Sequence, residues 1–102
     1  MKLPFELATA DEIACELGRR LRAHRLAQNF QQSELAARAG ISERALRNLE
    51  RTGRGTLDTF LRVAASLGLS GGLSSVFELK PKTIKEMDQA SATRERASRK
   101  LL

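Results

Sequence analysis

The sequence predicts an all-α domain, a bundle of four to five short helices followed by a basic C-terminal tail. Apolar residues recur at three- and four-residue spacings between residues 10 and 67, which is the period of a helix with one buried face. The apolar residues are mostly Leu and Ala, and both of these favour helices. There are only four Phe and no Tyr or Trp. Capping residues precede the apolar runs and glycines follow them. At 102 residues, one small domain is expected.

The first helix is predicted over about 10–28. Residues 1–8 are expected to be an irregular lead-in, since Pro4 disfavours an earlier start. Thr9 and Glu12 then have the spacing of a capping box. The predicted apolar stripe contains Ile13, Ala14, Leu17, Leu21 and Leu26. The arginines expected on other faces are Arg19, Arg20, Arg22 and Arg25.

Two short helices joined by a tight turn are predicted over about 32–39 and 43–51. Gly40 ends the first helix, where glycine easily adopts a left-handed conformation, and Ser42 caps the second. Ala36 is small enough to let the two helices cross closely. The positions expected to bury both helices are Leu35, Ala39, Ile41, Leu46 and Leu49. Together these features match the requirements of a helix-turn-helix.

A fourth helix is predicted over about 57–67, after a loop with two glycines and with Thr56 as its cap. Its expected apolar stripe consists of Leu57, Phe60, Leu61, Ala64 and Leu67, and Gly68 should end it. Residues 69–79 are ambiguous between a helix and a short strand over 76–79. Residues 9–79 are therefore expected to form the domain. Residues 80–102 are expected to be a basic, partly mobile extension.

Charge is unevenly distributed along the chain, whose formal net charge is +6. Residues 1–18 contain one lysine against four acidic residues, whereas residues 19–54 contain nine arginines against three glutamates. Residues 80–102 contain seven basic groups against three acidic ones. A basic domain favours a polyanionic partner, such as a nucleic acid or, less often, an anionic membrane surface. The competing interpretation is a solvated basic surface that only confers solubility.

No catalytic or metal-binding constellation is evident in the sequence. His24 is the only histidine and Cys15 the only cysteine, so neither a His/Cys metal set nor a catalytic triad is available. We expect His24 at the surface or partly buried, and Cys15 as a small core or interface residue. No apolar run approaches the roughly 18 residues of a membrane span, and no signal peptide is evident. A cytoplasmic protein without enzymatic activity, cofactor or membrane partner is expected.

The segment QQSELAARAGISERALRNLE (residues 31–50) carries a family resemblance. Together with the preceding ELGRRLRAHRLAQNF and the following TLDTFLRVAASLGL, it resembles the Cro and phage-repressor family of helix-turn-helix regulators, also called the xenobiotic-response-element type. The resemblance covers about residues 12–69. It implies a lambda-repressor-like bundle that binds a palindromic double-stranded DNA operator as a homodimer and acts as a repressor. The second helix of the motif would lie in the major groove.

The resemblance also implies DNA contacts for particular residues. These are Gln32, Ser42, Glu43, Arg44, Arg47 and Asn48. Their chemistry suits these roles, because arginine can bind guanine N7 and O6 bidentately and asparagine can bind adenine in the same way. Glu43 could accept from a cytosine amino group or orient Arg44 or Arg47. Arg51 and Arg54, at and after the end of the predicted helix, are two further candidate DNA contacts, better placed for phosphates than for bases. For every arginine, a solvated surface position is the alternative.

The surface for a second copy is expected in the ambiguous segment after the fourth helix. The candidate dimer contacts are Leu69, Leu73, Val76 and Phe77. The alternative for these four residues is packing onto the first or fourth helix of the same chain. Gln31 replaces the Ser or Thr that usually caps the second helix in this family, which predicts weaker capping there.

A second resemblance suggests a protein partner. The run ERTGRGTL at 50–57 and the tail RERASRK at 94–100 resemble a sub-group that includes HipB-like antitoxins. Such proteins are commonly encoded beside a HipA-like kinase toxin, which residues 71–88 and 94–102 would then hold. A further alternative is a non-specific nucleic-acid binder, including an RNA binder. The four Phe are expected in packing rather than in stacking on bases, which disfavours sequence-specific RNA recognition.

Overall fold

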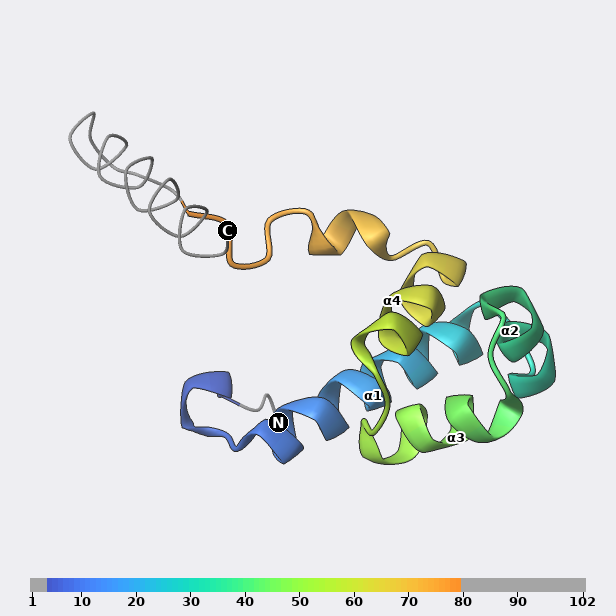
Figure 1. Ribbon diagram of the computed structural model, residues 1–102, viewed down its shortest axis with the longest axis horizontal. Coiled ribbons are helices and arrows are strands. Elements are labelled where there is room, and N and C mark those ends of the chain that lie inside the picture. The colour runs from blue at the N-terminus through green and yellow to red at the C-terminus, as the bar shows by residue number, and fades with distance from the viewer. Residues whose placement is uncertain (1–3, 80–102) are drawn as a thin grey trace, which may run out of the picture.

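Four α-helices form the described part of the chain, residues 4–79 of the computed structural model (Figure 1). The helices are α1 (Ala10–Ala27), α2 (Gln32–Ala39), α3 (Glu43–Thr52) and α4 (Leu57–Ser66). Short 3-10 helices, η1 (Phe5–Leu7) and η2 (Ser70–Leu73), flank them. The predicted all-α class is confirmed, and each predicted helix agrees with the structure to within one residue at either end. The predicted basic extension, residues 80–102, lies outside the described residues.

The caps of the helices are largely those that the sequence predicts. The Thr9 hydroxyl accepts from the Glu12 amide at 3.1 Å, and the Glu12 carboxylate accepts from the Thr9 amide at 3.0 Å, completing the capping box of α1. The Ser42 hydroxyl accepts from the Ala45 amide at 3.0 Å at the start of α3. At α2, Glu34 accepts from the backbone amide of Gln31 at 3.0 Å, so the carboxylate supplies a cap contact despite the unusual Gln31.

The core lies where the four helices meet. It consists of Leu21, Leu35, Ala36, Ala39, Leu46, Leu49, Val63, Ala64 and Leu67. Ala36 is 2% exposed and Gly40 has φ 70°, which confirms the predicted geometry of the α2–α3 turn. Leu26, Leu57 and Leu61 are exposed, so their assignment to apolar stripes is wrong. On α4 the buried stripe contains the fully buried Val63. The prediction missed it because apolar residues also flank the buried stripe, which leaves the rotation of the helix ambiguous in the sequence.

Helices α1 and α3 lie side by side and approach at two glycines (Figure 1). A Cβ atom on Gly18 would collide with the backbone carbonyl of Leu49, and a Cβ on Gly53 would collide with that of Ala14. Gly53 also has φ 73°, a left-handed conformation that suits glycine. Close backbone packing therefore fixes the distance between α1 and α3.

The two ends of the described chain differ from their predictions. The lead-in is not fully irregular, because Phe5–Leu7 form η1, with Pro4 before it and the Arg20 guanidinium 5.1 Å from the centre of the Phe5 ring. Beyond α4, neither a continuous helix nor a strand forms over 69–79. Two glycines shorten the helix to η2, and turns follow it.

No helix within residues 4–79 has the length and hydropathy needed to cross a bilayer.

Candidate nucleic-acid interface

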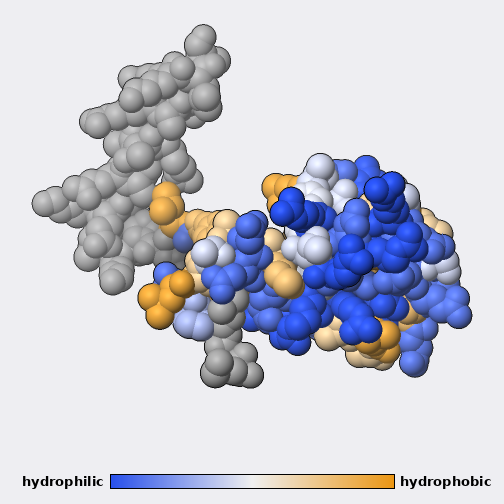
Figure 2. All heavy atoms as spheres, turned by 90° about the horizontal axis from the view of Figure 1, so that it is seen from below, coloured by the Kyte–Doolittle hydropathy of each residue, from blue (hydrophilic) through white to orange (hydrophobic). Residues whose placement is uncertain are grey.

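One face of α3 is a stripe of exposed polar side chains. Arg47, Asn48 and Arg51 lie three, four and seven residues after Arg44 and share this face with it. The opposite face of α3 is buried in the core. Figure 2 views the side of the molecule on which α3 lies in Figure 1, and this side is mostly hydrophilic. The structure thus brings four of the predicted site residues together on one exposed face of α3.

Glu43 lies beside one of the arginines of this stripe. Its Oε2 is 3.6 Å from Nη1 of Arg47, and both side chains are about half exposed. An exposed pair of this length contributes little to stability. The structure thus brings Glu43 close to Arg47, one of the two arginines that it was predicted to orient. Arg44 has no ion pair with any residue between 4 and 79.

A groove of about 450 Å³ runs beside the stripe. It is lined by Arg22, Gln32, Arg44, Arg47, Asn48, Glu50 and Arg51. Five of the eight predicted site residues therefore lie together. The other three, Ser42, Glu43 and Arg54, are exposed but do not line the groove. Arg22 and Glu50 line it without having been predicted as site residues.

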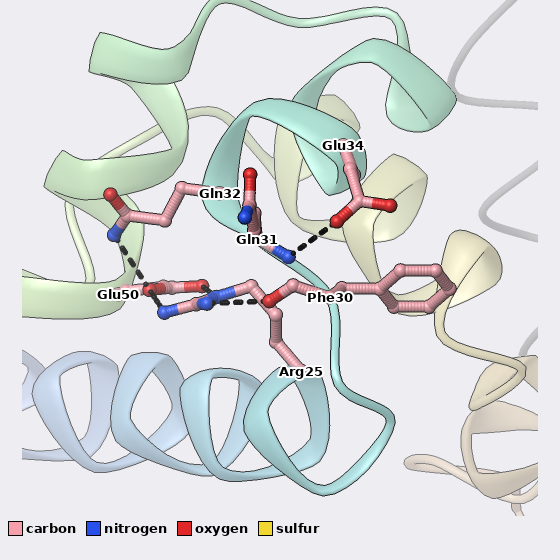
Figure 3. A network of polar contacts seen from close by, with 6 residues as sticks. All are labelled: Arg25, Phe30, Gln31, Gln32, Glu34 and Glu50. Carbon is pink, nitrogen blue, oxygen red and sulfur yellow. Dashed lines mark hydrogen bonds and ion pairs between the residues drawn. The ribbon is translucent and has the colours of Figure 1, made fainter.

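Glu50, at the floor of the groove, forms a buried ion pair with Arg25 that joins α3 to α1 (Figure 3). Nε and Nη2 of Arg25 donate to the two carboxylate oxygens of Glu50 at 2.7 and 3.0 Å. Nη1 of Arg25 donates to the carbonyl oxygen of Phe30 at 2.8 Å. The two side chains are only 8% and 2% exposed. The expectation that Arg25 lies away from the core is wrong.

A sequence signal for this pair did exist. Arg25 lies four residues after Leu21 and eight after Leu17, so it continues the apolar stripe of α1. Glu50 likewise follows Leu46 by four residues on the buried face of α3. A charged residue in register with an apolar stripe on each of two helices predicts a buried pair, since an unpaired buried charge is very costly.

Gln32 joins the same network. Its Nε2 donates to Oε1 of Glu50 at 3.1 Å, and its side chain is partly buried (Figure 3). The hydrogen bond orients the amide while leaving its oxygen as an acceptor. The network therefore ties α1, the α1–α2 connection, the start of α2 and α3 together. It holds α3 and Gln32 in a fixed relation.

Neighbouring arginines on α1 have a different environment. Arg19 and Arg20 both donate to Glu16, at distances of 2.7 to 2.8 Å. Hydrogen bonds from Arg19, which has the larger effect, and from Arg20 lower the pKa of Glu16 to about 2. These two guanidiniums thus have a neighbouring counter-charge across the ordinary pH range.

Cys15 and His24 do not line the groove. Cys15 is exposed rather than part of the core, and its thiol lies 3.8 Å from the carbonyl oxygen of Arg51. His24 is exposed, in line with its prediction. Within the part of the chain that the structure describes, no three His, Cys, Asp or Glu side chains gather in a metal-binding arrangement.

Comparison with known families agrees with this geometry. Residues 21–73, more than half of the chain, match the sequence profile of a helix-turn-helix family. The match begins within α1 and ends at the last residue of η2, so it includes α2, α3 and the groove between α1 and α3. A search of curated proteins found no match to the chain.

Proposed function

The chain belongs to the Cro/C1-type helix-turn-helix family of DNA-binding proteins, and we propose that it is a repressor that binds a palindromic operator as a homodimer. The observation that carries the proposal is the stripe of Arg44, Arg47 and Asn48 on an exposed face of α3. An α-helix with its side chains is about 10–12 Å across and fits a major groove about 12 Å wide. In this proposal α3 enters the major groove, and its exposed polar stripe reads the base edges. Because DNA lies inside the cell, an intracellular location follows from this proposal, and we propose the cytoplasm.

Each polar group on and around α3 has a distinct task in this proposal. Arg44, which has no ion pair among the described residues, reads guanine, and Asn48 reads adenine. Arg47 reads a base or a flanking phosphate in the orientation that Glu43 gives it. The Ser42 oxygen accepts from the Ala45 amide, so its hydroxyl proton is available for a phosphate.

Three groups next to these hold the DNA backbone or a nearby base. Arg51 at the end of α3 and Arg54 in the following loop bind phosphates, because both are exposed and basic. Gln32 contacts a phosphate or a base edge through the part of its amide that Glu50 does not engage. These contacts set the register of α3 on the duplex.

A second copy of the chain supplies the second reading helix. Val76 is 49% exposed and Phe77 is 98% exposed, directly after η2. Leu69 and Leu73 pack against the core of their own chain, as the alternative for these residues predicted. We infer that Val76 and Phe77 form the main contact with the second copy and that Leu69 and Leu73 support it from beneath. Two copies of α3 would then bind half-sites about 34 Å apart.

The same exposed apolar residues also favour a second candidate function, that of a HipB-like antitoxin. In this alternative, Val76 and Phe77 contact a HipA-like kinase toxin, and DNA binding regulates the operon that encodes both proteins. The chain itself would perform no chemical step, because the helix-turn-helix family is typically non-enzymatic. The antitoxin function and the repressor function share the same DNA-binding face.

Footprinting on the DNA upstream of the gene, together with the solution mass of the purified protein, tests the proposal. We expect two protected half-sites about one helical turn, ~34 Å, apart and a dimeric mass. A monomeric mass with a single protected stretch would contradict the homodimer. A monomer that gains the second half-site only when the product of the adjacent gene is added would favour the antitoxin. Absence of any protection would contradict both.

A further inference from the structure

Arg22 is the residue through which α1 contributes to the groove beside α3. It lies four residues after Gly18, the point at which α1 meets the backbone of Leu49, and therefore on the α3 side of α1. It is exposed, and it lines the groove opposite side chains that come from α2 and α3. This placement brings a guanidinium from a third helix to the predicted reading surface.

The groove has an excess of positive charge. It is lined by the four arginines Arg22, Arg44, Arg47 and Arg51. Of these, only Arg47 has an ion pair with a residue between 4 and 79, and that pair is long and exposed. The one carboxylate in the lining belongs to Glu50, which is 2% exposed and already accepts from Arg25 and Gln32. The groove therefore lacks a counter-ion of its own.

Like charges gathered around an open groove repel one another and attract an anion. A phosphodiester fits this charge, because its two non-bridging oxygens can accept from guanidiniums on both sides. We propose that the groove is a subsite for one backbone phosphate of the bound DNA and that Arg22 supplies its α1 contact. The inference rests on the proposed function and adds to it a contact outside the helix-turn-helix motif itself.

The contact would position α3 on the duplex. A phosphate held between α1 and α3 connects the DNA backbone to two helices that the Arg25–Glu50 pair already locks together. Phosphate contacts fix orientation without reading sequence, so Arg22 contributes equally to all duplexes. Arg22 differs in this from Arg44, to which the proposed function assigns a base.

Arg19 provides a matched control on the same helix. It is exposed like Arg22 and carries the same charge, but it donates to Glu16 at 2.8 Å and does not line the groove. Replacing either residue with alanine changes the net charge equally. A difference between Arg22→Ala and Arg19→Ala therefore measures the local contact and not the overall field of the protein.

The experiment measures binding to a random-sequence duplex of about 25 base pairs, a length that covers two half-sites, by fluorescence anisotropy over a range of salt concentrations. Loss of one phosphate contact should make the slope of log K against log salt less negative by about 0.9 and weaken binding roughly eightfold at ~0.1 M salt. We expect this of Arg22→Ala and not of Arg19→Ala, with partial recovery in Arg22→Lys. Unchanged thermal unfolding would show that Arg22→Ala remains folded.

Other outcomes would overturn the inference. Equal slopes for Arg22→Ala and Arg19→Ala would remove the subsite while leaving the proposed function intact. Binding of inorganic phosphate that depends on Arg22, combined with an unchanged slope on DNA, would assign the groove to a free anion and contradict the DNA contact. If the unmodified protein bound no duplex at all, both the inference and the proposed function would fail.

Discussion

Arg22 and Arg25 are three residues apart on α1, yet they have opposite environments. Arg25 is buried, and its three donor nitrogens contact Glu50 and the carbonyl of Phe30. Arg22 is exposed and has no ion pair among residues 4–79. A buried basic residue whose three nitrogens all donate within the protein has a structural role. A basic residue that reaches an open groove without a partner is available to a ligand.

The two regions also differ in what their charges cost. Taking a guanidinium and a carboxylate out of water carries a penalty that only a saturated pair offsets. The floor meets that condition through four hydrogen bonds among Arg25, Glu50, Phe30 and Gln32. The groove arginines remain hydrated and cost little in the free protein. Substitution in the buried Arg25–Glu50 pair should therefore reduce the stability of the fold. Substitution of an exposed groove arginine should instead reduce DNA binding.

Glu50→Gln should produce the largest effect on folding. It would leave the charge of Arg25 buried without its counter-charge and lower the free energy of unfolding by about 3–5 kcal/mol. Glu43→Gln is the matched control on the same helix, because it removes an exposed carboxylate 3.6 Å from Arg47. We expect less than about 0.5 kcal/mol for this control. Urea unfolding followed by circular dichroism measures both, and similar losses for the two variants would remove the distinction between the buried pair and the exposed pair.

Gly53→Ala should produce the next largest effect, because Gly53 sets the approach of α1 to α3 beneath the groove. Gly68→Ala is a fair comparison, since Gly68 has φ 75° against 73° for Gly53 but open space around its Cα. Backbone strain should cost both variants about 1–2 kcal/mol. The collision with the Ala14 carbonyl should add about 1–3 kcal/mol to Gly53→Ala alone. Equal midpoints of unfolding would show that close packing at Gly53 is not needed.

The helices of this chain could be predicted because their signals are local. Thr9, Ser42 and Thr56 all cap the helices assigned to them, and Gly40 and Gly68 have the left-handed backbone expected at helix ends. Rotation about the helix axis was less certain, because it depends on what packs against the helix. Leu61 and Val63 are both apolar, and only the packing of the other helices decides that Val63 is buried.

The site was predicted in part for the same reason. The exposed residues of α3 that line the groove follow from the motif and from helical spacing; they are Arg44, Arg47, Asn48 and Arg51. Arg22 and the Arg25–Glu50 pair depend on how α1 packs against α3, a contact between segments far apart in the sequence. Family resemblance supplied roles only for positions within the motif. The contribution of α1 required the tertiary structure.

The most direct test of the central claim is the effect of Arg44→Ala on two DNA targets at one salt concentration. The targets are the footprinted operator and an unrelated duplex, with Arg54→Ala as the control for a phosphate contact. We expect Arg44→Ala to weaken operator binding by about 1–3 kcal/mol and to change binding to unrelated DNA far less. Arg54→Ala should weaken both targets alike. Equal losses on the two targets for both variants would contradict sequence reading by α3.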